Sequence, residues 1–447
     1  MLNLMMAAIQ FITIDPGHFH AALVQNRTYE GVSPEVLVYA PDGADLKSHL
    51  SLIGQFNTRA ENPTAWKEKV YAGADFLEKF TADAAKRSAA QNASNVVVLA
   101  GRNNVKPDYY LAAAEAGINI LSDKPMAITS EDYMKLCEAA AVAKEKGLLF
   151  ADIMTERHEI TTILQRELSR RRGVYGVQEK GTPEDPAVTK VSVHHFCKLV
   201  NGKPLRRPGW YYDTKQQGEA IVDVTTHLTD IVQWALFPGA TLKRSDVKML
   251  AARTWPTPIT AADYEKSTGL KEWPKYLKGA VDGDNVLQCK ANGEFTYTLR
   301  GVHAKVAVEW HFMPPEGGGD THYSLMRGSN AELVIRQGPK QGFKPVLYVK
   351  LRPGADTAKT ETALNLAIAE ICDTYPGIKA VPAFGEEDGA TWKLDIPKKY
   401  DIGHEAHFSQ VMNQFLAWLK AGGMPEQERK NLLVKYHTLN EAWKMSR

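Results

Sequence analysis

The sequence lacks several features that mark special classes of protein. It has four cysteines in 447 residues, at positions 137, 197, 289 and 372, and no two of them form a CxxC pair. A disulfide framework and a zinc ribbon are therefore not expected. It also lacks an excess of charge of one sign, because 54 Lys and Arg oppose 52 Asp and Glu and leave a net charge of +2. This balance argues against nucleic acid or an anionic membrane surface as a partner.

Long hydrophobic runs are also missing. No stretch reaches the roughly 18 apolar residues that a membrane span needs, so no spanning helix is expected. The apolar N-terminus, residues 1–15, has no Lys or Arg before its apolar run and no clear small-residue cleavage site. We interpret it as the lead-in to a first strand rather than as a signal peptide. The interpretation predicts a cytoplasmic protein, with a periplasmic location as the alternative if a leader precedes residue 1.

The composition that is present is typical of a folded chain of two or three domains, with 44% apolar and 24% charged residues. In the N-terminal third, short apolar runs alternate with helical patterns. The strand-like runs are 9–14, 35–40, 95–101, 118–125 and 148–152; the helical stretches begin at 21 or cover 62–91, 108–116 and 130–146. Such alternation predicts a doubly wound parallel sheet whose ligands bind at the carboxyl ends of the strands.

The turn after the first run, residues 15–20 (DPGHFH), stands where a dinucleotide-binding chain has G-x-G-x-x-G. Only the middle glycine, Gly17, is kept, and it is the one that lets the backbone approach a pyrophosphate. Taken alone, this turn is better explained as a tight connection between a strand and a helix. Asp42 ends the second run, where an acid can accept from a ribose hydroxyl, but a surface aspartate in a Pro-Asp-Gly turn explains it equally well.

The middle of the chain carries a second polar group. A strand over 188–196 and an aromatic loop over 206–217 precede a predicted helix over 218–236. One stripe of that helix is apolar, and Asp223, His227 and Asp230 fall together on the other side. A histidine beside carboxylates can act as a general base, yet spacing alone favours a solvated polar face.

Two segments in this order raise the odds of an enzyme. They are AAAEAGINILSDKPMA (112–127) and GEAIVDVTTH (218–227). Together with the first turn they resemble the Gfo/Idh/MocA oxidoreductase family over most of residues 8–240, and the tail resembles a branch of that family from glycan-using bacteria. Asp15 and His20 stand where the family has glycines, Asp123 replaces a glutamate, and Glu219 replaces a glycine. Residues 245–400 match the general family poorly.

The resemblance implies an α/β architecture in three parts. A Rossmann domain would cover 1–152, an α/β domain for substrate and oligomer contacts would cover 153–400, and C-terminal helices over 401–447 would pack back on the body. The second domain would carry a large, mostly antiparallel open sheet. Strand-like runs at 295–302, 304–312, 331–337 and 345–351 fit it. A homodimer or homotetramer is expected from the family.

The resemblance also implies the chemistry. Lys124 would hydrogen-bond the reacting oxygen, His227 would take the hydroxyl proton, and Asp223 would orient the substrate or His227. The cofactor would be NAD, with NADP as the alternative. The predicted cofactor-binding residues are Asp15, Gly17, His18, Phe19, His20, Asp42, Gly101, Asn103, Asp123, Lys124 and Pro125.

Other candidates depend on residue type alone. Trp210, Tyr211 and Tyr212 could stack on a sugar ring or simply pack on the core, and we rate the two as even. His322 lies in a glycine-rich turn with Asp320, near His311, and is a substrate-binding candidate. No ligand spacing typical of zinc is present there, so no metal is predicted.

The predicted function is hydride transfer between NAD(P) and a secondary hydroxyl or ketone of a sugar, glycoside or cyclitol. The first alternative is a redox-neutral, NAD-dependent glycosidase of the same family, in which one retained cofactor oxidises and then reduces. The second is a non-catalytic nucleotide- or sugar-binding protein. The joint presence of Lys124, Asp223 and His227 argues against the second alternative, since binding needs no acid–base set.

Overall fold

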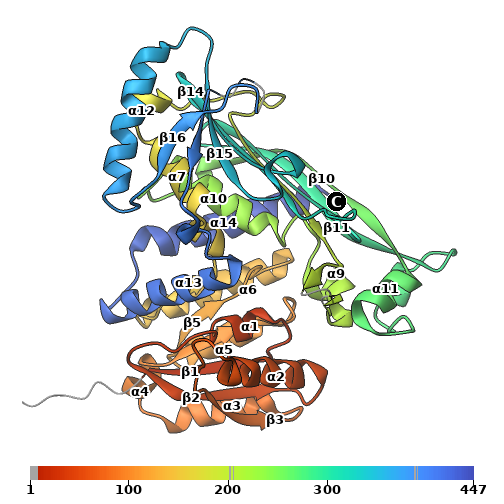
Figure 1. Cartoon of the computed structure of the whole chain (residues 1–447). Helices are drawn as coiled ribbons and strands as arrows, with labels where there is room; N and C mark the ends of the chain where they lie inside the picture. Colours follow the sequence, from red (N-terminus) through yellow and green to blue (C-terminus); the bar gives the residue numbers. More distant parts are fainter. Residues whose placement is uncertain (1–8, 201–202, 205, 387–388, 390) are drawn as a thin grey trace, which may run out of the picture. The chain divides into compact units, whose positions relative to one another are not determined.

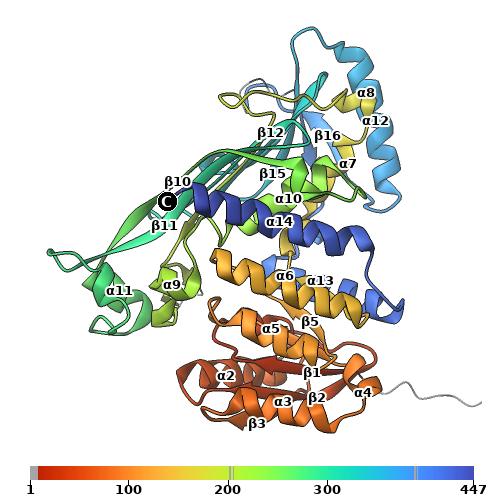
Figure 2. The same ribbon diagram turned by 180° about the vertical axis from the view of Figure 1, so that it is seen from behind.

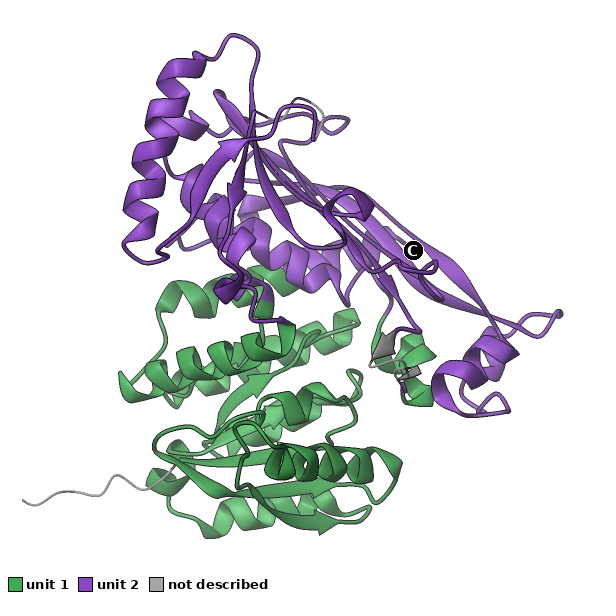
Figure 3. Ribbon diagram, viewed as in Figure 1, with its two compact units in different colours: residues 1–155, 208–218, 404–436 green, residues 156–207, 219–403, 437–447 purple. Residues whose placement is uncertain are grey.

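The computed structural model describes residues 9–200, 203–204, 206–386, 389 and 391–447 (Figure 1). The chain divides into two compact units (Figure 3). Unit 1 contains residues 1–155, 208–218 and 404–436, and unit 2 contains residues 156–207, 219–403 and 437–447. The predicted strand lead-in at residues 1–8 lies outside the described residues. Among those described, no helix has both the length and the apolarity needed to cross a bilayer.

Unit 1 is built on a six-stranded parallel sheet in the order β3-β2-β1-β4-β5-β6. The strands are β1 Ile9–Ile14, β2 Val32–Ala40, β3 Lys67–Ala72, β4 Val96–Leu99, β5 Asn119–Ser122 and β6 Phe150–Asp152. This is the strand order of a Rossmann fold, with the topological switch between β1 and β4. Every residue of β4 and β5 is buried, as is typical of parallel strands that are covered on both faces.

Helices cover this sheet, as opposite views show (Figure 1, Figure 2). They are α1 His20–Leu23, α2 Ala44–Thr58, α3 Phe76–Lys86, α4 Ala89–Ala93, α5 Lys106–Glu115, α6 Ser130–Glu145 and α13 His404–Lys420. The short helices η2 Gly209–Tyr212 and α9 Thr214–Gln217 also belong to unit 1. From α13, Phe408 and Met412 join the core formed by β1, β2 and β4. The last helix, α14 Glu426–Met445, starts in unit 1 and ends in unit 2.

Two local predictions in unit 1 were wrong. The stretch 62–91, predicted to be helical, contains strand β3 before α3. The strand was missed because this edge strand has charged, solvent-facing residues and no apolar alternation. The sequence also suggested Ser130 as the cap of the helix predicted over 130–146, but the cap of α6 is Thr129. The Thr129 hydroxyl accepts from the Asp132 N–H at 3.1 Å, and Asp132 accepts from the Thr129 N–H in return.

Unit 2 is built on a nine-stranded sheet in the order β10-β11-β12-β7-β13-β14-β15-β17-β16. The strands are β7 Val188–His195, β10 Val247–Thr260, β11 Val286–Leu299, β12 Val302–His311, β13 Thr321–Arg327, β14 Ala331–Gln337, β15 Val346–Leu351, β16 Lys379–Pro382 and β17 Trp392–Asp395; β8 Leu199–Val200 and β9 Lys203–Pro204 form a separate pair. Within the large sheet the β12–β7 pair is parallel and the other pairs are antiparallel. The predicted large, mostly antiparallel sheet is therefore confirmed.

Helices of unit 2 bury their apolar sides against this sheet. They are α7 Ile160–Ser169, α8 Arg172–Tyr175, α10 Thr225–Leu236, α11 Ala261–Thr268 and α12 Thr357–Cys372, with short 3-10 turns η1 Thr155–His158, η3 Arg244–Asp246, η4 Lys278–Ala280, η5 Pro339–Gln341 and η6 Lys398–Tyr400. Leu164 of α7 and Leu364 of α12 meet Leu333 and Leu347 of the sheet in one core.

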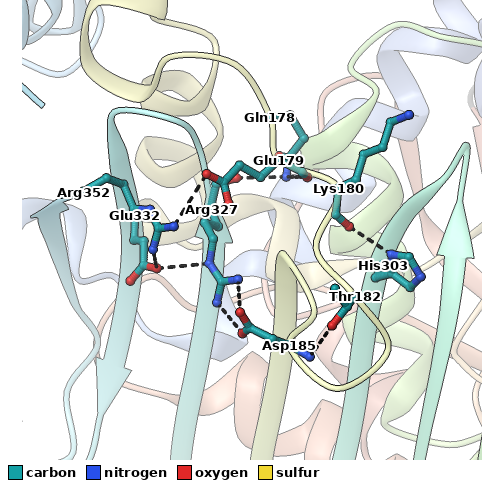
Figure 4. A network of polar contacts seen from close by, with 9 residues as sticks. All are labelled: Gln178, Glu179, Lys180, Thr182, Asp185, His303, Arg327, Glu332 and Arg352. Atoms are coloured by element: carbon teal, nitrogen blue, oxygen red, sulfur yellow. Dashed lines mark hydrogen bonds and ion pairs between the residues drawn. The ribbon is translucent and has the colours of Figure 1, made fainter. Parts of the chain in front are cut away.

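A polar network holds the loop between α8 and β7 onto the sheet (Figure 4). Both Nη atoms of Arg327 donate to the two carboxylate oxygens of Asp185 at 2.7 Å. Its Nε donates to Glu332 at 3.1 Å, and Arg352 donates to the same oxygen at 3.1 Å. The bidentate contact with Arg327 lowers the pKa of Asp185.

Candidate functional site

The turn after β1 holds an aspartate in a left-handed conformation. Asp15 has φ +46° and is 3% exposed. Its Oδ2 accepts from Nη2 of Arg102 and from the Tyr109 hydroxyl, both at 3.0 Å. Because Arg102 offsets its charge, a carboxylate at this position does not by itself oppose a phosphate group bound nearby.

The loops after β1 and β4 approach each other closely at the switch point. A Cβ placed on Gly101 would lie 2.2 Å from the carbonyl oxygen of Asp15. A Cβ on Gly17 would lie 3.0 Å from Cζ2 of Trp210 and 3.2 Å from a carboxylate oxygen of Asp45. Close packing against backbone therefore requires a glycine at position 101 and favours one at position 17, in the crevice where a Rossmann fold receives its dinucleotide.

The aromatic segment 208–218 belongs to unit 1 and lies against this turn. The Trp210 indole donates to Asp45 at 2.9 Å, and the Tyr211 ring stacks near the His18 ring with centroids 6.0 Å apart. Both side chains are buried, as is Tyr212. The packing alternative is thus observed, and stacking on a sugar stays a prediction.

Asn103 fixes the same segment. Its side chain donates to the Gln217 carbonyl at 2.6 Å, and its backbone N–H donates to the Gln216 carbonyl at 2.8 Å. The predicted role in binding the cofactor is therefore joined by an observed role in anchoring residues 208–218.

The acids after β2 differ in their surroundings. Asp42 is exposed at the end of the strand. Phe19, a predicted cofactor-binding residue of the first turn, is also exposed, at 37%. Asp45, three residues further along, is the one that faces Gly17, and burial raises its pKa. Sequence reasoning missed Asp45, because nothing near position 45 signals its pairing with a tryptophan 165 positions away.

Asp123, at the end of β5, meets two histidines of the first turn. Nδ1 of His20 lies 2.9 Å and Nδ1 of His18 lies 3.9 Å from its Oδ2. Burial raises the pKa of Asp123, but the attraction of His20, His18 and Lys106 outweighs it and holds that pKa well below its usual range. Lys124 follows directly and is partly exposed, and its peptide bond to the buried Pro125 is cis.

A third imidazole lies beside this group. The ring of His404, at the start of α13, lies 6.2 Å from that of His20. The pKa of His404 is lowered to about 3 by desolvation of its ring together with the proximity of His20 and His407. Sequence reasoning did not name His404, because nothing in the spacing identifies His20 as its partner.

The predicted catalytic residues of unit 2 are buried. Helix α10 begins at Thr225, not at 218, so Asp223 lies in the turn before it and His227 in its first turn. Asp223 is 4% and His227 is 9% exposed. The solvated polar face that the spacing favoured is therefore wrong, because Asp230 on the same side pairs with Arg157 through contacts of 2.6 and 2.8 Å inside unit 2.

Asp320 and His322, from one predicted turn, have different neighbours. Asp320 contacts Nδ1 of His195 at 3.0 Å, Nδ1 of His194 at 3.3 Å and the ammonium of Lys198. The His311 ring lies 5.9 Å from that of His195. Burial lowers the pKa of His322 to about 3, and the charge of Lys190 contributes.

Two family models match the chain. Residues 164–447 match a model described as "Putative oxidoreductase C terminal domain", and residues 45–151 match one described as "Oxidoreductase family, NAD-binding Rossmann fold". A crystal structure described as a "putative oxidoreductase" from Parabacteroides merdae ATCC 43184 has 49% sequence identity, a TM-score of 0.93, and 98% coverage of both chains. The chain belongs to the Gfo/Idh/MocA oxidoreductase family. No match was found among curated proteins.

Two solved structures with lower sequence identity are similar to this chain in fold. KijD10, a 3-ketoreductase from Actinomadura kijaniata solved with NADP and TDP-benzene, has 14% identity and a TM-score of 0.54, with 97% of this chain and 96% of that one covered. Levoglucosan dehydrogenase, solved with NADH, has 12% identity and a TM-score of 0.55, with 98% of each chain covered. Family membership confirms the predictions of an oxidoreductase and of an NAD-binding Rossmann domain.

Proposed function

We propose that this oxidoreductase transfers a hydride between NAD(P) and a secondary hydroxyl or ketone of a sugar, glycoside or cyclitol. The observation that carries the proposal is the position of Lys124 directly after β5, at the carboxyl edge of the Rossmann sheet. Ligands of such sheets bind at this edge. An ammonium there can stabilise negative charge that develops on a reacting oxygen.

The residues of the first turn fit a dinucleotide. Gly17 and Gly101 let the loops after β1 and β4 pack closely at the switch point. Arg102 offsets the charge of Asp15. The turn 15–19 would face the pyrophosphate, and the exposed Asp42 would accept from ribose hydroxyls. Bound NAD(P) would supply the hydride acceptor or donor.

The chain's own residues would manage the proton and the charge. As the carbinol hydrogen leaves as hydride, His227 would accept the hydroxyl proton, so that a neutral carbonyl forms. Lys124 would donate to the same oxygen and stabilise partial negative charge on it. Asp223, in the turn that precedes His227, would position the substrate or the imidazole.

Support for a carbohydrate substrate comes from two distant neighbours. One is described as a levoglucosan dehydrogenase and another as a 3-ketoreductase. Trp210, Tyr211, Tyr212 and His322 remain the predicted substrate-binding residues of this chain. A sugar offers secondary hydroxyls, which suit acid–base residues, and apolar C–H faces, which suit aromatic rings.

The proposal is tested by following NADH formation with a panel of glycosides and cyclitols. We expect at least one to reduce NAD⁺, and we expect His227→Asn and Lys124→Met each to lower kcat by about 10²-fold or more. His303→Asn is the matched control, since His303 bonds only to the carbonyl of Lys180 among its described contacts and should leave the rate unchanged. Sugar release without net NADH would favour the redox-neutral alternative. Wild-type rates in both catalytic variants would refute the assigned roles.

A further inference from the structure

His18, His20 and Asp123 form a compact ligand set at one edge of the Rossmann sheet. One donor atom from each lies within 4.8 Å of those of the other two. His18 and His20 come from the turn after β1, and Asp123 follows β5. Strands β1 and β5 both flank β4, so their carboxyl ends bring together residues that are 103 positions apart.

We propose that these three side chains bind one divalent transition-metal ion of the zinc class. Two imidazole nitrogens and one carboxylate oxygen are a donor set that such ions prefer. The site does not depend on the proposed substrate, and it goes beyond the sequence prediction, which named no metal.

The observed spacings are close to those that coordination requires. Ligands at about 2.0–2.1 Å from a tetrahedral ion lie about 3.3 Å from one another. The separations of His20 and His18 Nδ1 from Asp123 Oδ2, 2.9 and 3.9 Å, fall on either side of that value. Binding of one ion by all three donors would require His18 to approach Asp123 and His20 to move slightly away from it.

The ligands are also shielded and held in place. Their side chains are only 13%, 12% and 7% exposed for His18, His20 and Asp123. The Asp123 N–H donates to the Leu99 carbonyl at 2.6 Å, and the Asp123 carbonyl accepts from the ammonium of Lys106. Ligands whose backbone and orientation are fixed by a second layer of hydrogen bonds bind metals more tightly.

The histidine pair has a suitable local geometry. The two rings are nearly perpendicular, at 84°, with centroids 4.1 Å apart. The His20 ring also packs against Phe408 of α13 at 4.6 Å, which restricts its rotation. Three protein ligands leave at least one coordination position for water or for an oxygen atom of a bound molecule.

The competing explanation is an ordinary histidine–aspartate ion pair with no ion. Equilibrium dialysis of chelator-treated full-length protein against Zn²⁺ alone, without nucleotide, separates the two. We expect one zinc per chain in the wild type, and visible d–d absorption when Co²⁺ replaces it. Absence of stoichiometric binding of either ion would overturn the proposal.

Variants locate the ion. His20→Ala and His18→Ala should each weaken zinc binding by at least about 10-fold, and Asp123→Asn should do the same. His303→Ala, which removes a histidine of unit 2, is the control and should keep one zinc per chain. Circular dichroism of each variant reports whether it folds, and the two histidine variants replace Asp123→Asn if that one does not. Full binding in folded His20→Ala and His18→Ala would also overturn the proposal.

Discussion

The indole nitrogen of Trp210 donates a hydrogen bond to Oδ2 of Asp45 at 2.9 Å. The same oxygen lies 3.2 Å from the position that a Cβ on Gly17 would occupy. The contact joins the aromatic segment 208–218 to the start of α2 within unit 1. A residue of the chain's middle therefore helps to shape the turn that follows the first strand.

Replacing Trp210 by Phe should loosen this turn. The change removes one hydrogen bond to a partly buried carboxylate, which contributes about 1.5–3 kcal/mol, and part of the indole packing on Gly17. We expect a loss of that size in the free energy of unfolding, measured by urea denaturation, and weaker NAD⁺ binding by calorimetry. Trp273→Phe is the control, because its indole bonds to Asn285 near the surface. Equal losses in the two variants would contradict the assignment.

Gly101→Ala should disturb the switch point itself. The added methyl group would lie 2.2 Å from the Asp15 carbonyl oxygen, so one of two strand-end loops must move. We expect destabilisation of about 1–3 kcal/mol, as for other overpacked sites, together with weaker nucleotide binding. Gly54→Ala within α2 meets nothing within 4 Å and should instead stabilise by roughly 0.5–1 kcal/mol. A neutral Gly101→Ala would show that the loops have room to spare.

Lys190 should make unit 2 less stable at neutral than at alkaline pH. Burial lowers its pKa to about 7, and its ammonium contacts Gln165 and Ser324 rather than an acid. Between pH 7 and about 10.4 the unfolded chain binds more protons than the folded chain, so the free energy of unfolding rises with pH. Below pH 7 the whole penalty applies.

The test is the difference in unfolding free energy between wild type and Lys190→Met from pH 7 to 9.5. The variant should be more stable by about 1–3 kcal/mol at pH 7, after allowance for lost hydrogen bonds, and the advantage should shrink as the pH rises. The exposed Lys278→Met serves as the control and should track the wild type. A constant difference across the range would exclude a depressed Lys190 pKa.

Asp230→Ala should cost more than the loss of any surface ion pair. The Asp230 side chain is 2% exposed and accepts two hydrogen bonds from Arg157, so its removal leaves a partly buried guanidinium without its buried carboxylate. We expect a loss of about 3–5 kcal/mol in thermal or chemical unfolding. Lys444→Ala breaks the exposed pair with Glu441 and should cost at most about 1 kcal/mol. Similar costs would mean that the Arg157 pair adds little to the anchoring of α10.

The sequence predicted the parts of the fold whose signals are local. The apolar runs that contain β1, β4 and β5 were identified as strands, and every residue of β4 and β5 and the last four residues of β1 are buried. Strand β3 was missed because its exposed edge selects charged residues. The start of α10 at Thr225 was missed because residues 218–224 have the same apolar spacing as the helix but form turns.

The site was less accessible to sequence reasoning. His18, His20 and Asp123 were named individually as cofactor-binding residues, but their convergence depends on the strand order β1-β4-β5. Asp45 and His404 were not named, because each meets its partner across more than 160 positions. Spacing along the chain carries no information about such contacts.

The central claim, an oxidoreductase that uses NAD(P), is tested most directly by one measurement on the purified full-length chain. The protein is denatured, and the supernatant is analysed by mass spectrometry for NAD(H) and NADP(H), before and after incubation with excess NAD⁺ and removal of the unbound nucleotide by rapid gel filtration. We expect close to one nucleotide per chain in at least the second sample. No nucleotide in either sample, from a protein that is folded by circular dichroism, would contradict the claim.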